Sequence, residues 1–377
     1  MCVIFSQHWT KQTKYDIMGA LQSVEISENG RAKRKDVTLM KMKNKAETVN
    51  WKGLECVQLT AGGYTALIAP GIGSNVLRLH DDVNGIEFFR WDEANTPDDI
   101  RASAEVWGLP TLYLPNRFAD GILRTSDAEY HLPVNEAAPF HNHIHGFLHK
   151  RVHTVIAQSA NEEGAWVRTC YVYNENDPFF QYFPLPFTAE FLFMLSETGL
   201  EYKFSIKNQS QHKLPVSIAT HTTISAPFVD GAKEEDIQIQ VPVEEKWILD
   251  DRCLPTCETR SLDGYDMQYK NGTTCPVKRV VDNDMYTGGK LTFRGRPFRG
   301  VLMTDSASGK GIGYEVSDAY RFWILWNDRG EKHYFCPEPM TAMIDAPNLK
   351  LPAEKTGYCE LVPGENFHVA QHFFTIV

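Results

Sequence analysis

The 377-residue sequence lacks three features that mark large classes of protein. It has no basic excess, because 38 lysines and arginines are outnumbered by 48 aspartates and glutamates, for a formal net charge of −10. It has no apolar run long enough to cross a membrane, and residues 1–5 are too short for the core of a signal peptide. These absences argue against a nucleic-acid-binding, membrane or secreted protein, and we expect a cytoplasmic location.

The paired Cys-x-x-Cys spacing of structural zinc sites is also absent. Eight cysteines are scattered along the chain. Three residues separate Cys253 from Cys257, and Cys275 follows. In a chain of this length without a secretion signal, scattered cysteines are typical of free thiols in a reducing compartment. We therefore predict no zinc at these cysteines.

Long stretches with helical periodicity are few, whereas many runs alternate apolar and polar residues or are continuously apolar. Residues 166–173 and 200–207 alternate as half-buried strands do, and residues 188–195 and 321–326 have the composition of buried strands. Short polar turns separate such runs. The sequence predicts an all-β fold in the form of a large antiparallel sandwich.

The first 50 residues differ from the rest. They contain two basic clusters, at residues 31–35 and 41–45, and few aromatic residues. We predict a basic, loosely structured N-terminal extension over residues 1–50, followed by one domain over residues 51–377.

One carboxylate has an unusual sequence setting. Glu338 lies between Pro337 and Pro339 in the aromatic and apolar run that starts at Phe335. Proline fixes φ and biases the preceding residue toward extended geometry, so Glu338 is held on a stiff backbone. A rigid carboxylate beside apolar residues is a candidate general base. The alternative is a surface glutamate on a proline-rich edge strand.

Histidines supply the second set of candidates. His141, His143 and His145 are spaced two apart, so on a strand they would share one face and could ligate a metal. Alternatively, one of them, held by the turn at Gly146, faces a pocket. His221 ends a second apolar run, where a lone histidine is more often a hydrogen-bonded core residue than a catalyst.

Asn116 and Arg117 follow a proline and precede the turn at Gly121. Their side chains could donate hydrogen bonds to a polar ligand. Taken alone, the pattern is not specific.

Taken in order, seven segments resemble the aldose 1-epimerase (galactose mutarotase-like) family. These are residues 62–76, 115–121, 132–147, 200–221, 281–286, 336–348 and 361–365. The resemblance runs from about residue 55 to the C-terminus and implies a β-supersandwich with one sugar site.

The resemblance also implies roles for individual residues. Glu338 would be the general base, His221 the general acid, and His145 would assist at the ring oxygen or an adjacent hydroxyl. Arg117 and Asp284 would bind sugar hydroxyls, supported by Asn116. Two departures from the family, Thr222-Thr223 after His221 and Pro339-Met340 after Glu338, point to a different substrate pocket.

The implied activity is that of an isomerase that interconverts the anomers of an aldohexose without metal or cofactor, as a monomer or homodimer. A hexose-6-phosphate 1-epimerase is an alternative, because Arg294, Arg296 and Arg299 are close in sequence and could bind a phosphate. A non-catalytic sugar-binding protein on the same fold is another. A glycoside hydrolase would usually need two facing carboxylates, and Glu338 is the only strong candidate.

Overall fold

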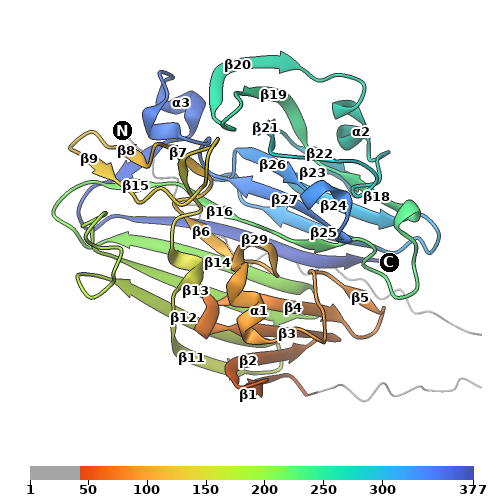
Figure 1. The fold of residues 1–377 in the computed structure, drawn as a ribbon. Coiled ribbons are helices and arrows are strands. Elements are labelled where there is room, and N and C mark those ends of the chain that lie inside the picture. The colour runs from red at the N-terminus through yellow and green to blue at the C-terminus, as the bar shows by residue number, and fades with distance from the viewer. Residues whose placement is uncertain (1–42) are drawn as a thin grey trace, which may run out of the picture. The chain divides into compact units, whose positions relative to one another are not determined.

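A computed structural model describes residues 43–377, and every strand pairing in it is antiparallel. None of the helices in this range is long and apolar enough to span a membrane. Figure 1 shows strands of several layers and only short helices. The prediction of an all-β antiparallel fold is confirmed.

Three large sheets make up the domain. The first, in order across the sheet, contains β11 (Thr154–Ala160), β12 (Ala165–Tyr173), β13 (Phe187–Ser196), β14 (Gly199–Asn208), β29 (Asn366–Ile376), β25 (Gly311–Val316), β24 (Gly300–Asp305) and β18 (Ile237–Gln240). The second contains β20 (Pro255–Ser261), β19 (Val243–Leu249), β21 (Asp284–Gly288), β26 (Phe322–Trp326), β27 (Tyr334–Met340), β16 (Ile218–Thr220) and β6 (Thr111–Tyr113), and β17 (Ile224–Ser225) also pairs with β27. The third contains β1 (Lys45–Trp51), β2 (Leu54–Ala61), β3 (Tyr64–Ala69), β4 (Asn75–Asp81) and β5 (Ile86–Glu87).

Shorter elements connect and cover these sheets. Four two-stranded pairs are β7 (Arg117–Ala119) with β10 (Asn142–Ile144), β8 (Ile122–Arg124) with β9 (Glu129–His131), β15 (Leu214–Val216) with β28 (Cys359–Leu361), and β22 (Leu291–Phe293) with β23 (Arg296–Phe298). The α-helices are α1 (Pro97–Ala102), α2 (Asp266–Asn271) and α3 (Ala353–Thr356). The 3₁₀ turns are η1 (Pro70–Ile72), η2 (Ala104–Val106), η3 (Leu148–Lys150), η4 (Glu234–Asp236), η5 (Asp328–Gly330) and η6 (Ala346–Asn348).

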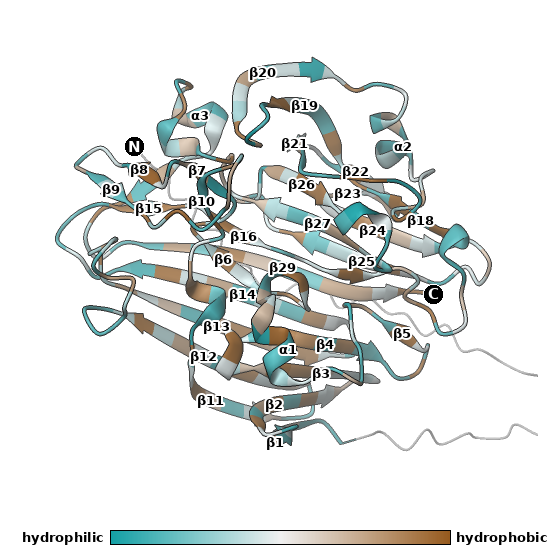
Figure 2. Ribbon diagram, in the orientation of Figure 1, coloured by the Kyte–Doolittle hydropathy of each residue, from teal (hydrophilic) through white to brown (hydrophobic). Residues whose placement is uncertain are grey.

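The four predicted strands are present as β12, β13, β14 and β26. Along β13 every second residue is buried, from Phe187 to Leu195, and Figure 2 shows hydropathy alternating along the neighbouring strands. This period of two places one face of the sheet in the main core.

The predicted domain boundary at residue 50 is wrong. Residues 45–51 form β1, which pairs along its whole length with β2, from Lys45 opposite Thr60 to Trp51 opposite Leu54. The Trp51 ring also lies 5.5 Å from the Trp91 ring. Basic residues did not preclude a strand, because β1 is an edge strand whose charged side chains face solvent. The rest of the predicted extension, residues 1–42, lies outside the described residues.

Strand β27 is an interior strand, so Glu338 is not a surface glutamate on an edge. All seven of its residues are buried, and it pairs along five residues with β26, where Glu338 is opposite Ile324. On its other side it pairs with β16 only at Met340 and with β17 only at Tyr334 and Phe335. Residues 336–339 therefore have no strand partner on that side. Proline has no N–H to donate, so Pro337 and Pro339 are tolerated where no neighbouring strand needs that hydrogen bond.

Candidate active site

The gap beside β27 brings His221 to Glu338. Residues 221–223 link β16 to β17 across this gap, and the His221 N–H donates to the Pro110 carbonyl at 3.1 Å. The His221 Nε2 lies 3.3 Å from the Glu338 Oε1, and their side chains are only 5% and 4% exposed. A carboxyl group and an imidazole thus form a buried pair within proton-transfer distance.

His145 joins this pair from a different sheet. It follows β10 with a φ of 66°, and its N–H donates to the Asn116 carbonyl at 2.9 Å. The next residue, Gly146, is required, because a Cβ there would lie 2.1 Å from the Tyr113 carbonyl oxygen. The His145 and His221 rings are 5.4 Å apart in an edge-to-face arrangement.

The expectation that three histidines share one face is wrong. The strand covers only residues 142–144, and positive φ angles at His141 and His145 turn the chain at both ends. His141 is 62% exposed and its Nδ1 lies 3.2 Å from Asp120, whereas His143 is buried against Phe179. Within residues 43–377 no group of three or more His, Cys, Asp or Glu residues is arranged to hold a metal.

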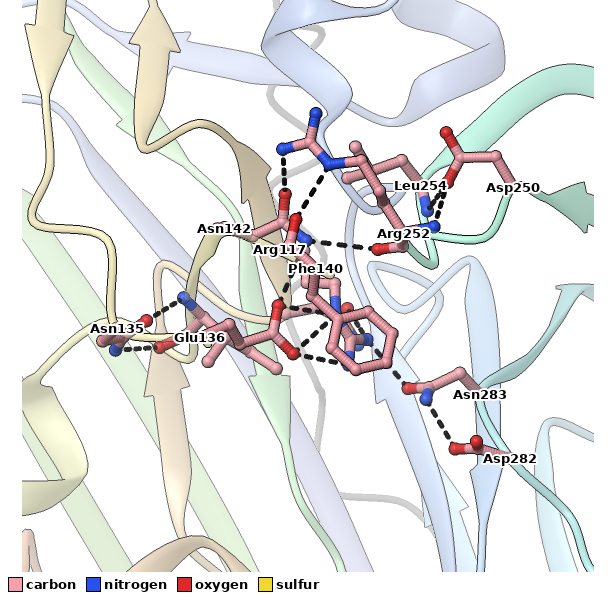
Figure 3. A network of polar contacts seen from close by, with 12 residues as sticks. Arg117, Asn135, Glu136, Phe140, Asn142, Asp250, Arg252, Leu254, Asp282 and Asn283 are labelled. Atoms are coloured by element: carbon pink, nitrogen blue, oxygen red, sulfur yellow. Dashed lines mark hydrogen bonds and ion pairs between the residues drawn. The ribbon is translucent and has the colours of Figure 1, made fainter. Parts of the chain in front are cut away.

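Arg117 is held in a polar network, which Figure 3 shows from close by. Its Nε and Nη2 donate to both carboxylate oxygens of Glu136 at 2.9–3.1 Å, and its Nη1 donates to Asn283 at 3.0 Å. A weaker contact of 3.4 Å joins Nη1 to the Asn116 Oδ1. The Arg117 charge lowers the pKa of Glu338, although burial has the larger and opposite effect.

The network explains two of the sequence motifs. Asn135 exchanges two hydrogen bonds with the backbone of Ile144, the residue before His145, so it fixes the entry to that histidine. Asp345 accepts from the Ala119 N–H at 3.3 Å, and its own N–H donates to the Arg117 carbonyl at 3.1 Å. Each motif therefore orients a residue of the candidate site.

Four residues in or next to this network have left-handed backbone conformations. Asn116, His145, Asn283 and Asp345 all have φ between 55° and 66°, which side-chain-bearing residues rarely adopt. Such conformations persist where the surroundings impose them, and they cluster at functional sites.

Asp284 is not brought to the site. Asp284 pairs with Leu325 on β26, whereas Glu338 pairs with the adjacent residue, Ile324. Because successive residues of a strand face opposite sides of the sheet, the side chains of Asp284 and Glu338 lie on opposite faces. There its carboxylate pairs with Lys246 at 2.5 Å. The neighbouring Asn283, which sequence reasoning missed, is the residue that contacts Arg117.

Burial governs the protonation of the pair. It raises the pKa of Glu338 well above its usual value and lowers the pKa of His221 to about 4. It also holds the pKa of His145 well below that of a free imidazole, and the neighbouring His221 adds to the shift. Both shifts favour the uncharged forms, a protonated Glu338 and an unprotonated His221, so the pair holds one proton in the pH range between the two pKa values.

Trp326 is a second neighbour that sequence reasoning missed. It ends β26, remains partly exposed, and its ring lies 5.6 Å from the His221 ring in an edge-to-face arrangement. An aromatic ring beside an acid–base pair suits the apolar C–H face of a sugar. A signal for it was present, because a tryptophan at the end of a buried strand next to a turn is a candidate binding residue.

The departure after His221 has a structural reason. Thr222 is buried and shares hydrogen bonds with Tyr314 and Thr220 at 2.9 and 3.1 Å. Thr223 donates to the His221 carbonyl at 3.2 Å. Both threonine side chains thus form hydrogen bonds inside the protein, and these bonds stabilise the segment that carries His221.

Two of the three arginines of the phosphate alternative, Arg296 and Arg299, form ion pairs with carboxylates other than Glu338. Arg296 pairs with Glu315 at 3.6 Å, and Arg299 pairs with Asp318 at 3.1 Å. Arg299 also lines a cleft of about 420 Å³ with Trp247, Phe322 and Arg321, and none of the candidate catalytic residues lines it. These arginines therefore do not support that alternative.

The fold and the site define a class of protein, an antiparallel β-sandwich with a buried carboxyl–imidazole pair between strands. The model of the aldose 1-epimerase family matches residues 55–373, and the chain belongs to that family.

Solved structures agree. A galactose mutarotase-like protein from Clostridium acetobutylicum is 30% identical, with a TM-score of 0.85 over 88% of this chain and 98% of that one. A galactose 1-epimerase from Lactobacillus acidophilus NCFM is 14% identical, with a TM-score of 0.64 over 89% and 98%. An aldose epimerase homologue from C. elegans is 16% identical, with a TM-score of 0.64 over 88% and 99%. The last two show the shared fold alone, which is the galactose mutarotase-like sandwich.

Proposed function

We propose that this protein is a mutarotase, an isomerase that interconverts the α and β anomers of an aldohexose. The observation that carries the proposal is the side-by-side placement of Glu338 and His221, 3.3 Å apart. Anomerisation moves one proton off the C1 hydroxyl and one proton onto the ring oxygen. Both oxygens are bonded to C1, so the base and the acid must be neighbours.

The chemistry follows from a pair that shares one proton. With the proton on His221, the Glu338 carboxylate removes the proton of the C1 hydroxyl while His221 protonates the ring oxygen. The C1–ring oxygen bond breaks, and the aldehyde rotates about C1–C2. The ring closes on the other face with the two groups in exchanged roles, and the pair again holds one proton. Each proton-transfer partner typically contributes ~10²–10⁴-fold in rate.

The surrounding residues take supporting roles. His145, beside His221 and without a hydrogen-bond partner on its Nδ1 among the described residues, would bond the ring oxygen or an adjacent hydroxyl. Arg117 and Asn116 would bind hydroxyls, and Asn283 would take the role that was predicted for Asp284. The Arg117 charge favours the carboxylate form of Glu338, which the base must have.

The geometry disfavours a glycoside hydrolase. A hydrolase usually has two carboxyl groups about 5–9.5 Å apart. Here the partner of Glu338 is an imidazole, and the nearby Glu136 is bound to Arg117 through both oxygens. A sugar-binding protein without activity would need no buried acid–base pair.

Polarimetry tests the proposal. Freshly dissolved α-glucose and α-galactose should reach their equilibrium rotation faster with purified protein, in proportion to its concentration. A rate equal to that of the buffer for both sugars would count against the proposal. The cytoplasmic location and a monomeric or homodimeric state remain predictions.

A further inference from the structure

Glu105 and His149 form a second carboxylate–imidazole pair, which the proposed mechanism does not use. The Glu105 Oε2 lies 3.7 Å from the His149 Nε2 and 3.8 Å from the Lys150 Nζ. The His149 side chain is fully buried, whereas that of Glu105 is 28% exposed. Glu105 is in η2, and η2 packs against η3, the turn that contains His149 and Lys150. The pair therefore joins a buried imidazole to a carboxylate that reaches the surface.

The segment after Glu105 runs beside the segment that carries His221. The pairing of β6 with β16 continues beyond both strands, because the carbonyls of Pro110 and Gly108 accept from the N–H groups of residues 221 and 223, both at 3.1 Å. The buried side chain of Asn75 bonds to the backbone on both sides of Gly108, at 2.8 Å each. The backbone that follows Glu105 is thus fixed against that of His221.

Both pairs include buried polar atoms without a hydrogen-bond partner. Among residues 43–377 ten buried side-chain nitrogen or oxygen atoms have none, and five of the ten are on four residues of the two pairs and their neighbour, namely Glu105, His145, His149 and His221. A buried polar group without a partner costs free energy, so a concentration of such groups calls for a functional explanation.

The Glu105 charge acts on both histidines of the candidate active site. Burial lowers the pKa of His221 to about 4, and the Glu105 carboxylate has the largest opposing effect. The same charge raises the pKa of His145, although burial and the neighbouring His221 have larger and opposite effects. Burial raises the pKa of Glu105 itself, but His149 and Lys150 together hold it below its usual value. Glu105 is therefore ionised at neutral pH.

The other charged groups near the two pairs are cations, which disfavour a proton on His221. They are Lys150 and Arg151, which follow His149, Arg90, which donates to the carbonyl of residue 106 in η2, and Arg117, which lowers the pKa of His145. Arg151 is paired with Asp177, and Arg117 is paired with Glu136. None of these cations can replace the negative charge of Glu105.

The proposed mechanism needs a charge of this kind. It requires the shared proton on His221, whereas burial of both groups favours the proton on Glu338. At Glu338 the Arg117 charge opposes the effect of burial. At His221 the opposing charge is that of Glu105.

We propose that Glu105, held against His149, is a positioning residue for the shared proton, because its negative charge favours the form with the proton on His221 and a free carboxylate on Glu338. This inference rests on the proposed mutarotase function and adds a residue to its mechanism.

The test is Glu105→Gln, which removes the charge and keeps the size of a partly exposed side chain. We expect kcat for anomerisation of glucose or galactose to fall about 3–30-fold with little change in KM, because a nearby charge changes a pKa by roughly one pH unit. Since the Glu105 charge raises the pKa of His221, its loss should also move the acid limb of the kcat profile to lower pH. Glu105→Asp, which keeps the charge, should retain most of the activity.

A matched control is Asp98→Asn, which removes an exposed carboxylate from α1, the helix before η2, and should leave kcat and the acid limb unchanged. An unchanged kcat and acid limb in Glu105→Gln would overturn the inference. A loss of kcat with the acid limb in place would show a structural role and would overturn it as well.

NMR titration of the histidine ring signals needs no activity and so separates the two proposals. The His221 signal, identified by its absence in His221→Asn, should titrate at lower pH in Glu105→Gln than in the wild type. Such a change in a protein without activity on any sugar would refute the mutarotase function and keep the effect of Glu105 on the pair. Activity on glucose with an unchanged His221 titration would do the reverse.

Discussion

Glu338→Gln is the most informative change at the site, because it keeps the shape of the side chain and removes the base. Among the described residues, His221 contacts the carboxyl group of Glu338 and no other carboxyl group, and Glu136 is engaged by Arg117. No substitute base is therefore in place, and we expect kcat to fall by ~10²–10⁴-fold, or about 3–5 kcal/mol of barrier. KM should change much less, since an amide still hydrogen-bonds a hydroxyl.

The same change predicts an unusual effect on stability. Burial raises the folded-state pKa of Glu338 above its unfolded value, so ionising this group costs stability as the pH rises above the unfolded pKa of about 4.5. A neutral glutamine lacks this cost. Glu338→Gln should therefore be as stable as the wild type at pH 7, or more stable, in thermal unfolding.

The assay is polarimetry of fresh α-glucose, with Glu190→Gln as a control that makes the same chemical change at an exposed position on β13. Glu338→Gln with near wild-type turnover would refute the assignment of the base. A strong loss of stability would refute the account of its burial.

Four further predictions concern the pair, its supports and the N-terminus. His221→Asn should slow turnover by ~10²–10⁴-fold, and the double variant with Glu338→Gln should lose less than the sum, because the two groups act as a unit; strictly additive losses in kinetic assays would contradict this. The pH profile of kcat/KM should fall at both ends, with the acid limb near pH 4 where His221 takes a second proton and the alkaline limb where Glu338 loses the shared one; activity that keeps rising below pH 4 would contradict the shared proton. Glu136→Gln should raise KM about 10-fold with a smaller change in kcat, because it releases Arg117 from its bidentate contact; an unchanged KM would exclude that positioning role. A chain starting at Lys43 should keep full activity, whereas a chain starting at Lys52 should unfold at a lower temperature because it lacks β1; equal melting temperatures would show that β1 is dispensable.

The sequence predicted the fold class because alternation and buried runs are local signals. Residues 166–173 and 200–207 were recognisable as strands without any knowledge of their partners. The predicted boundary at residue 50 was wrong because β1 is an edge strand with charged side chains. Its strand conformation depends on pairing with β2, which the composition of the segment does not indicate.

The site was predictable only in part. Ordered resemblance to one family led to Glu338, His221, His145 and Arg117. The structure places His221 beside both Glu338 and His145, and Arg117 follows Asn116, whose carbonyl accepts from the His145 N–H. The prediction for Asp284 was wrong because a shift of one residue along a strand moves a side chain to the opposite face of the sheet. Matching a short motif does not determine that face. Trp326 lies outside the matched motifs. Its position at the end of a strand made it a candidate, and the three-dimensional arrangement shows that it adjoins His221.

The most direct test of the central claim is exchange between the two anomers at chemical equilibrium. Saturating the C1 proton of the α anomer by NMR should reduce the β signal in the presence of the wild-type protein, and the Glu338→Gln/His221→Asn double variant should abolish this transfer while still binding sugar. Transfer at the wild-type rate with the double variant, or no transfer with the wild type for neutral and anionic aldohexoses alike, would contradict the account.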